Sequence, residues 1–225
     1  MRTSAAVLSL FAAAGASAAT QDRDVPAFDS VHVASGIHAT VAVGPRKPVH
    51  LEADKEVLDV IETRVEDGTL HVGFKPRTHL WNTGEVTVSI QTPELHAVAG
   101  SGGAIVRATF TRAPSSAISA SGGGELHVRG VDARELLVEA SGGAVVDVAG
   151  RADQLSLQLS GGSRFDARQF EARNVDVEGS GGSVAELRAT GKVRGALTGG
   201  SEMHVRGGAR ATVATTGGSE ISVDD

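Results

Sequence analysis

The chain has 225 residues, of which 40% are hydrophobic and only 3% aromatic, with 29 glycines and a formal net charge of −6. A core of aliphatic residues with few rings suits thin β layers better than a bulky globule. The acidic balance and the scattered basic residues leave no basic footprint, so we expect no nucleic-acid partner. The chain has no cysteine, which excludes disulfides, thiolate metal sites and a lipid-modified N-terminal cysteine.

Residues 1–19 have the pattern of a secretory signal peptide. Arg2 supplies a positive charge, residues 5–14 form an apolar stretch, and Ala16-Ser17-Ala18 gives the small-residue cleavage pattern. A bilayer needs an apolar stretch of about 20 residues, and neither this segment nor any later one reaches that length. We therefore expect an exported protein, periplasmic or extracellular at the cell surface, without a transmembrane span.

Residues 20–94 predict an N-terminal cap and the first β segments. Residues 31–43 alternate apolar and polar side chains, with Ser35-Gly36 as a degenerate bend. Residues 55–62 place their apolar side chains near one helical face, which favours a short helical turn. Asp67-Gly68 between two alternating runs predicts a β-hairpin.

Residues 95–225 repeat a hydroxyl residue followed by two glycines. The motifs begin at Ser101, Ser121, Ser141, Ser160, Ser180, Thr198 and Thr216. Their spacing of 18 to 20 residues is typical of stacked, one-dimensional architectures. We predict an all-β, single-stranded parallel β-helix, or solenoid, with coils of about 18–20 residues and an N-terminal β cap. The domain runs as one continuous unit from about residue 27.

Apolar columns keep the same register in every repeat. Five residues after the hydroxyl stand Val106, Leu126, Val146, Phe165, Ala185, Met203 and Ile221, and two positions further on stand Ala108, Val128, Val148, Ala167, Leu187, Val205 and Val223. Each column is expected to face inward and to stack on the next coil at the ~4.8 Å spacing of neighbouring strands. A helix is excluded because the apolar period is two and each paired glycine costs about 1 kcal/mol in a helix.

These features resemble a bacterial family called putative auto-transporter adhesin, head GIN domain. The resemblance rests on the exported leader, on Phe28, Ser35-Gly36 and Asp67-Gly68-Thr69-Leu70 in the cap, and on the serial Ser-Gly-Gly bends, and it covers about residues 27–225. It implies a β-helical extracytoplasmic module and no catalytic residues. Family members often continue with another strand and turn, whereas this chain stops at Asp225, which leaves open how the last coil is capped.

One outward column offers a candidate site. Six residues after each hydroxyl stand Arg107, His127, Asp147, Asp166, Glu186, His204 and Ser222. The adjacent carboxylates Asp147, Asp166 and Glu186 can bind a cation or serve as an acid/base column acting on a polysaccharide. The neighbouring column holds arginines, among them Arg129 and Arg168, which favours surface ion pairs instead. We therefore assign no catalytic, cofactor-binding or metal residues, and keep the three carboxylates as an alternative.

Other constellations point away from bound ions and catalysis. The residue after each glycine pair is Ala, Gly or Ser, not the Asp that calcium-filled solenoid bends require. Seven equivalent hydroxyls predict a structural column able to bond bend amides, because a nucleophile needs a base and an oxyanion hole at one place. Trp81, the only tryptophan, lies in a loop of residues 76–84 and is expected to pack onto the cap, with stacking on a sugar as the alternative.

The sequence therefore predicts a non-enzymatic, secreted or periplasmic β-solenoid without cofactors. Its expected role is that of an adhesin-like or envelope interaction module, with an unidentified envelope protein or glycan as partner. Two alternatives stay open. One is a glycan-binding or glycan-cleaving β-helix that uses the acidic column, and the other is a self-assembling module whose last coil pairs end to end with another copy.

Overall fold

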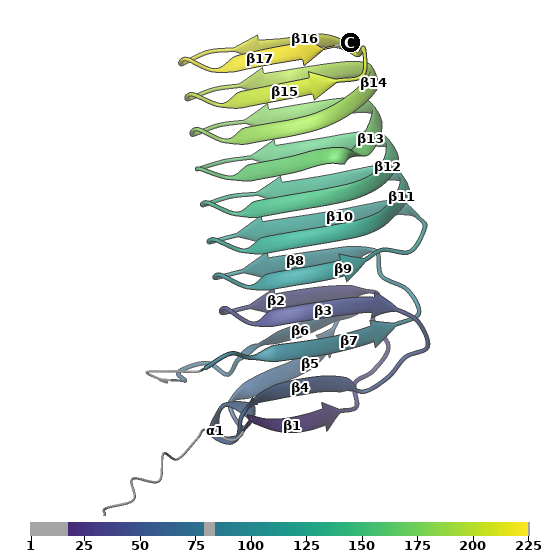
Figure 1. The fold of residues 1–225 in the computed structure, drawn as a ribbon, viewed down its shortest axis with the longest axis vertical. Helices are drawn as coiled ribbons and strands as arrows, with labels where there is room; N and C mark the ends of the chain where they lie inside the picture. Colours follow the sequence, from purple (N-terminus) through teal and green to yellow (C-terminus); the bar gives the residue numbers. More distant parts are fainter. Residues whose placement is uncertain (1–17, 79–83, 225) are drawn as a thin grey trace, which may run out of the picture.

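The computed structural model describes residues 18–78 and 84–224, which form a stack of β coils (Figure 1). A single short helix, α1 (Lys55–Leu58), lies among the described elements. The strands are β1 (Ala18–Arg23), β2 (Ser30–Ala34), β3 (His38–Val43), β4 (Val49–Asp54), β5 (Ile61–Glu66), β6 (Thr69–Phe74), β7 (Thr87–Thr92), β8 (Ala97–Ser101), β9 (Ile105–Thr109), β10 (Ala113–Ser121), β11 (Glu125–Ala140), β12 (Val145–Leu159), β13 (Arg164–Gly179), β14 (Val184–Leu197), β15 (Glu202–Arg206), β16 (Arg210–Thr215) and β17 (Glu220–Asp224). The predicted parallel β-solenoid is confirmed.

Each coil turns sharply at the Gly-Gly motif and gently on the opposite side. At the sharp corner after β11, Gly142 and Gly143 have φ of 66° and 89°, values that glycine adopts without a Cβ clash. β11 to β14 run continuously around the gentle side, whereas the chain leaves strand there between β9 and β10 and between β15 and β16 (Figure 1). We call the gentle side the convex edge. The stack therefore consists of a pre-corner sheet and a post-corner sheet, joined by glycine corners on one side and by the convex edge on the other.

The core lies between the two sheets and is built from the predicted columns. In the post-corner sheet, Val146 is paired with Phe165 and Phe165 with Ala185 in parallel register. These three side chains have exposed fractions of 0%, 0% and 1%, so they share one interior. Backbone hydrogen bonds hold successive rows at the spacing of neighbouring strands, and aliphatic contact between rows supplies the burial.

The variation in coil length is absorbed at the convex edge. Strand pairing shifts register between Val128 and Val131 in β11, between Asp147 and Ala149 in β12, and after Ala167 in β13. The residues that flank the corners stay in line through these shifts. Coils of 18 and of 20 residues can therefore stack without moving an inward column to the solvent face, as a register slip in a plain strand would.

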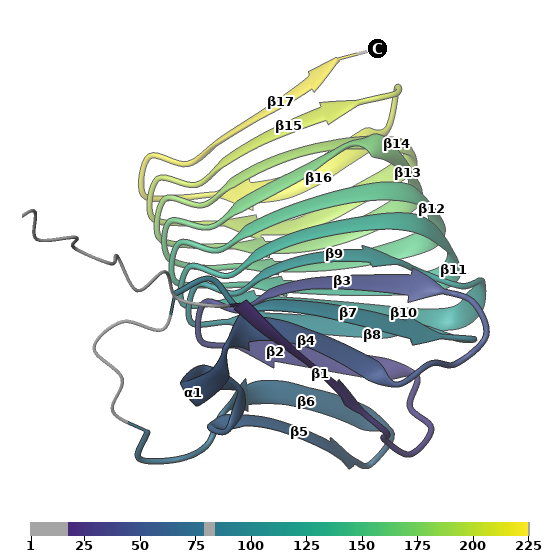
Figure 2. The ribbon, with the colours of Figure 1, turned by 60° about the horizontal axis from the view of Figure 1, so that its bottom comes forward.

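In the N-terminal cap, the order of the strands along the stack differs from their order in the sequence. β2 and β3 form a coil whose corner is Ser35-Gly36, with φ of 64° and 71°, as the sequence predicts. This coil lies between β8/β9 on one side and β6/β7 on the other, although β6 and β7 come later in the chain (Figure 2). β4 then pairs antiparallel with β7, β1 with β4, and β5 with β6. The antiparallel strands close this end of the stack.

The local predictions within the cap agree with the structure. α1 occupies the start of the predicted helical segment 55–62, and Asp67-Gly68 is the turn of the β5–β6 hairpin. The predicted signal peptide, residues 1–19, lies outside the described part of the chain except for its last two residues, where β1 begins. In the described ranges 18–78 and 84–224, no helix is long and apolar enough to span a membrane.

The other end of the stack is formed by β16 and β17. β16 pairs with β14, and β17 with β15, both in parallel. The inward column becomes accessible here, because Ile221 is half-buried and Val223 is 42% exposed. Among the described residues, the outer edges of these two strands have no pairing strand.

Candidate functional site

The structure brings the predicted acidic column together on the post-corner sheet. His127 pairs with Asp147 on the neighbouring strand, Asp147 with Asp166, and Asp166 with Glu186. The column continues from Glu186 to His204 in β15. Every predicted member therefore occupies the expected place, one strand apart along the stack.

Arginines pair with all three carboxylates: Arg129 and Arg168 come from the neighbouring column, and Arg164, two residues before Asp166, donates from Nη2 to Oε1 of Glu186 at 2.8 Å. Arg129 donates two hydrogen bonds to Asp147, from Nη1 to Oδ1 at 3.0 Å and from Nη2 to Oδ2 at 2.6 Å. Arg168 donates from Nε and Nη2 to Asp166 and also lies 3.6 Å from Oε2 of Glu186. The carboxylates are only 20% to 28% exposed, so these ion pairs are partly shielded from water.

The ion pairs lower the pKa of two carboxyl groups in the column, Asp147 and Asp166. Hydrogen bonds from Arg129, followed by that from His127, lower the pKa of the Asp147 carboxyl, although partial burial opposes the shift. Hydrogen bonding from Arg168 likewise lowers the pKa of Asp166. A general acid that acts near neutral pH needs a raised pKa, as in glycosidases. Asp147 and Asp166 therefore suit a role as charged members of ion pairs better than one as a proton donor.

Histidines end the ladder on both sides. His127 Nε2 lies 2.7 Å from Oε1 of Glu125, and His204 Nε2 lies 2.8 Å from Oε1 of Glu202. In residues 18–78 and 84–224, no group of three or more His, Asp or Glu side chains has an arrangement that could hold a metal ion. The other ring nitrogen of each histidine contacts the neighbouring strand, since His127 Nδ1 lies 3.4 Å from Oδ2 of Asp147 and His204 Nδ1 lies 2.5 Å from Oγ of Ser222.

The hydroxyl column at the corners behaves differently from the sequence expectation. Ser180 Oγ and Thr198 Oγ1 donate to carbonyl oxygens of the preceding coil, at 3.5 and 3.4 Å, instead of binding bend amides. In a second hydroxyl column, directly after the glycines, one member binds an amide, while Ser183 Oγ donates to Ser201 Oγ and Ser201 Oγ to the Thr198 carbonyl oxygen. Ser201 is buried, and its amide donates to Oγ of Ser219 at 3.1 Å. The alternation of inward and outward residues after the corner is the signal that predicts this second column.

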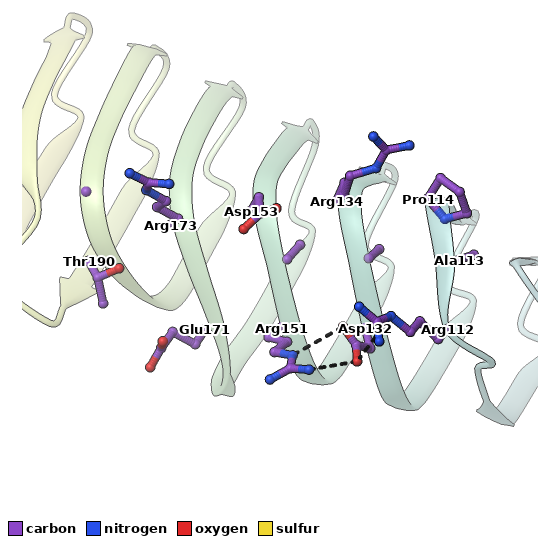
Figure 3. A pocket seen from close by; sticks show the side chains of 13 residues that line it. Arg112, Ala113, Pro114, Asp132, Arg134, Arg151, Asp153, Glu171, Arg173 and Thr190 are labelled. Carbon is purple, nitrogen blue, oxygen red and sulfur yellow. Dashed lines mark hydrogen bonds and ion pairs between the residues drawn. The ribbon is translucent and has the colours of Figure 1, made fainter.

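Sequence analysis missed a pair of charged columns on the convex edge (Figure 3). In the first column, Asp132 accepts hydrogen bonds from Arg151 at 2.9 and 3.2 Å, and Arg112 approaches it at 3.9 Å. The next members of this column are Glu171 and Arg188, which lie 3.5 Å apart. Charges thus alternate along it, as cross-strand pairing favours. This alternation is visible in the sequence as far as Glu171, because its members stand nine residues before successive corner hydroxyls.

The second column on the convex edge contains Arg134, Asp153 and Arg173. A hollow of about 790 Å³ lies between the two columns and crosses the strands β10 to β14. A second hollow of about 550 Å³ adjoins it through Arg173, Thr190 and Gly191. We call the two hollows together the convex-edge groove. Trp81 lies outside the described residues, so its packing onto the cap stays a prediction.

Fold and surface together define a class: a capped, parallel β-solenoid with charged ladders on its outer faces. The family model for the putative auto-transporter adhesin, head GIN domain, matches residues 27–209. The chain belongs to this family, as the sequence resemblance predicted.

Solved structures with the same fold support the architecture. A putative adhesin from Bacteroides fragilis superposes with a TM-score of 0.81 at 18% identity, covering 93% of this chain and 97% of that one. A putative adhesin from Parabacteroides merdae gives a TM-score of 0.68 at 14% identity, with 92% and 96% covered. A protein from Parabacteroides distasonis described as a putative lipid binding protein gives 0.67 at 15%, with the same coverage. None of the curated proteins matches the chain.

Proposed function

We propose that this protein is a non-enzymatic interaction module of the cell envelope, exported to the periplasm or the cell surface. The solenoid presents long, rigid, charged faces, and its partner is an envelope protein or a glycan. The observation that carries the proposal is the neutralised ladder, because Asp147 and Asp166 are held in arginine ion pairs that lower the pKa of both. Membership of an adhesin-named family points in the same direction.

An unbiased binding screen tests this role. Purified chain is offered to an array of envelope glycans and to immobilised envelope proteins, with and without calcium. We expect saturable binding to at least one partner and no release of cleaved product. Turnover of a glycan, or no binding to any envelope component, contradicts the proposal.

The acidic column remains the basis of the glycan-cleaving alternative. Replacing Asp147, Asp166 and Glu186 together by alanine removes every carboxylate that this alternative uses. We expect the triple variant to bind its envelope partner as the parent chain does, because the ladder serves the fold. Loss of a measurable hydrolytic activity in the triple variant would favour the alternative instead.

Self-association is a second candidate role, favoured by the unpaired outer edges of β16 and β17. These two strands run in opposite directions on the two sheets, so a two-fold axis perpendicular to the stack brings each edge against an antiparallel partner. The antiparallel cap closes the other end, which favours a tail-to-tail pair over a filament. Light scattering across a concentration series tests this idea, and a single monomer mass throughout contradicts it.

A further inference from the structure

We infer that the convex-edge groove binds a linear anionic glycan that lies along the solenoid axis. The inference deepens the proposed interaction role and rests on it. It names the partner class and the surface, neither of which follows from membership of the family. The inference is carried by a set of basic side chains that the fold places together and that form no salt bridge with any described residue.

The groove is lined by basic side chains, several of which have no salt-bridge partner in residues 18–78 and 84–224. Its lining includes seven basic and four acidic side chains, so it is locally positive on a chain of net charge −6. Five of the basic side chains have no salt bridge or side-chain hydrogen bond among the described residues, and all five are exposed; they are Arg134, Arg173, Lys192, Arg194 and Arg210. In Figure 3, Arg134 and Arg173 lie on the wall opposite the Arg112, Asp132 and Arg151 row.

The two parts of the groove differ in which charges face each other across neighbouring strands. On the first column the fold sets opposite charges against each other, as with Asp132 and Arg151. Further along the stack it sets Lys192 against Arg210 on neighbouring strands, whereas Arg194, two residues after Lys192, faces Asp176. Like charges in this position destabilise a sheet. A bound anion between them removes that cost, so the surface is suited to an anionic ligand.

The spacing suits a chain and not a single anion. Arg134 lies on β11, Arg173 on β13, Lys192 and Arg194 on β14, and Arg210 on β16. Neighbouring strands are about 4.8 Å apart, so the cations extend over four steps, roughly 19 Å. A polymer with anionic groups repeated along its length can contact them in turn. Guanidinium groups bind carboxylate, sulfate and phosphate oxygens through paired hydrogen bonds.

A glycan fits the groove better than other polyanions do. Neither hollow is lined by an aromatic side chain, whereas single-stranded nucleic acids are held by stacking on aromatic rings. No large apolar side chain projects from its walls to anchor in a bilayer, and the groove is concave, whereas interfacial binding uses a broad basic face with apolar anchors. Acidic side chains in the walls, such as Asp153 and Asp176, offer acceptors for sugar hydroxyls.

Binding by calorimetry with matched variants tests the inference. The probes are oligogalacturonate, dextran sulfate, neutral dextran, an oligothymidylate and phosphatidylserine vesicles. The groove variant carries R134Q, R173Q, K192Q, R194Q and R210Q. The control variant carries R46Q, K47Q, K55Q, R107Q and R206Q, which removes the same net charge from exposed positions outside the groove. Far-UV circular dichroism and the thermal midpoint verify that both variants fold like the parent.

We expect the parent and the control to bind a charged glycan, with affinity falling as salt rises, and the groove variant to lose at least tenfold, about 1.4 kcal/mol. Oligogalacturonate binding identifies carboxylate as the anionic group, and binding to dextran sulfate alone identifies sulfate. The inference is overturned if the parent binds neither charged glycan, if both variants lose affinity equally, or if neutral dextran, the oligothymidylate or the vesicles bind as tightly. If the screen finds an envelope partner and the groove variant still binds it, binding in the groove is refuted while the proposed role stands. If the screen finds no partner, the proposed role itself is refuted.

Discussion

Two neighbouring leucines on β11 provide the sharpest test of the coil geometry. Leu136 is 1% exposed, and its partner on the next strand is Leu155, which is also buried. Leu137 directly follows it, points outward and is 38% exposed. Truncation of either residue to alanine removes the same atoms from the same strand. Any difference between the two variants therefore measures burial alone.

We expect Leu136→Ala to lower the free energy of unfolding by about 3 kcal/mol, within the roughly 2–5 kcal/mol seen for buried leucines. The cavity cannot close, because hydrogen bonds to the coils on both sides hold the rows about 4.8 Å apart. Leu137→Ala is expected to cost about 1 kcal/mol or less, because much of its side chain already contacts water.

Urea unfolding followed by far-UV circular dichroism measures the effect, with hydrogen exchange of β11 and β12 amides as a local readout. The exchange data are needed because coils of a solenoid are coupled mainly to their neighbours, so unfolding can depart from two states. Equal losses for the two variants, or a larger loss for Leu137→Ala, would refute the inward stacking of alternate residues.

The remaining predictions concern the corner, the ladder and bound metal. At the corner before β13, Gly161 has φ of 67° and an added Cβ would lie 3.0 Å from the Gly142 amide nitrogen, whereas Gly162 lies outside the left-handed region with nothing within 4 Å of its Cβ position. Gly161→Ala is therefore expected to cost about 1–2 kcal/mol and Gly162→Ala less than about 0.5 kcal/mol in urea unfolding, and equal costs would contradict this. Since the folded-state pKa values of Asp147 and Asp166 are lowered, their contribution is present above the unfolded pKa of about 3.9 and disappears as pH falls. The double variant D147N/D166N should thus be less stable than the parent at pH 7 and approach it between about pH 5 and pH 2, and a gap that stays constant with pH would speak against the ladder. Addition of EDTA should leave the thermal midpoint unchanged, because arginines neutralise the ladder, and a fall would reveal a stabilising metal.

Periodicity in the sequence was sufficient to predict most of the solenoid. Val146, Phe165 and Ala185 recur at the same offset from a Ser-Gly-Gly corner, and an inward column must recur in this way when each coil is buried by its neighbours. The acidic column could be placed for the same reason. Its ion pairs could be anticipated from the adjacent arginines, but their geometry and the lowered pKa values depend on side-chain directions that spacing does not give.

The convex-edge groove could not be predicted from residue spacing. Coil length varies there through register shifts, so an offset from the hydroxyl no longer identifies neighbours beyond Glu171, and the facing of Lys192 and Arg210 appears only in three dimensions. The threading of the cap is a second case, because β2 is placed between β6 and β8 by pairing of segments far apart in the chain.

The sequence by itself thus determined the coil, its inward rows and its glycine corners, because these depend on local periodicity and on backbone angles that glycine permits. Only the tertiary structure decided the order of the coils in the cap and which basic side chains lie together on the convex edge. Both arise from contacts between distant segments, whose pairing is fixed by the competition among all strands for partners and not by any one repeat.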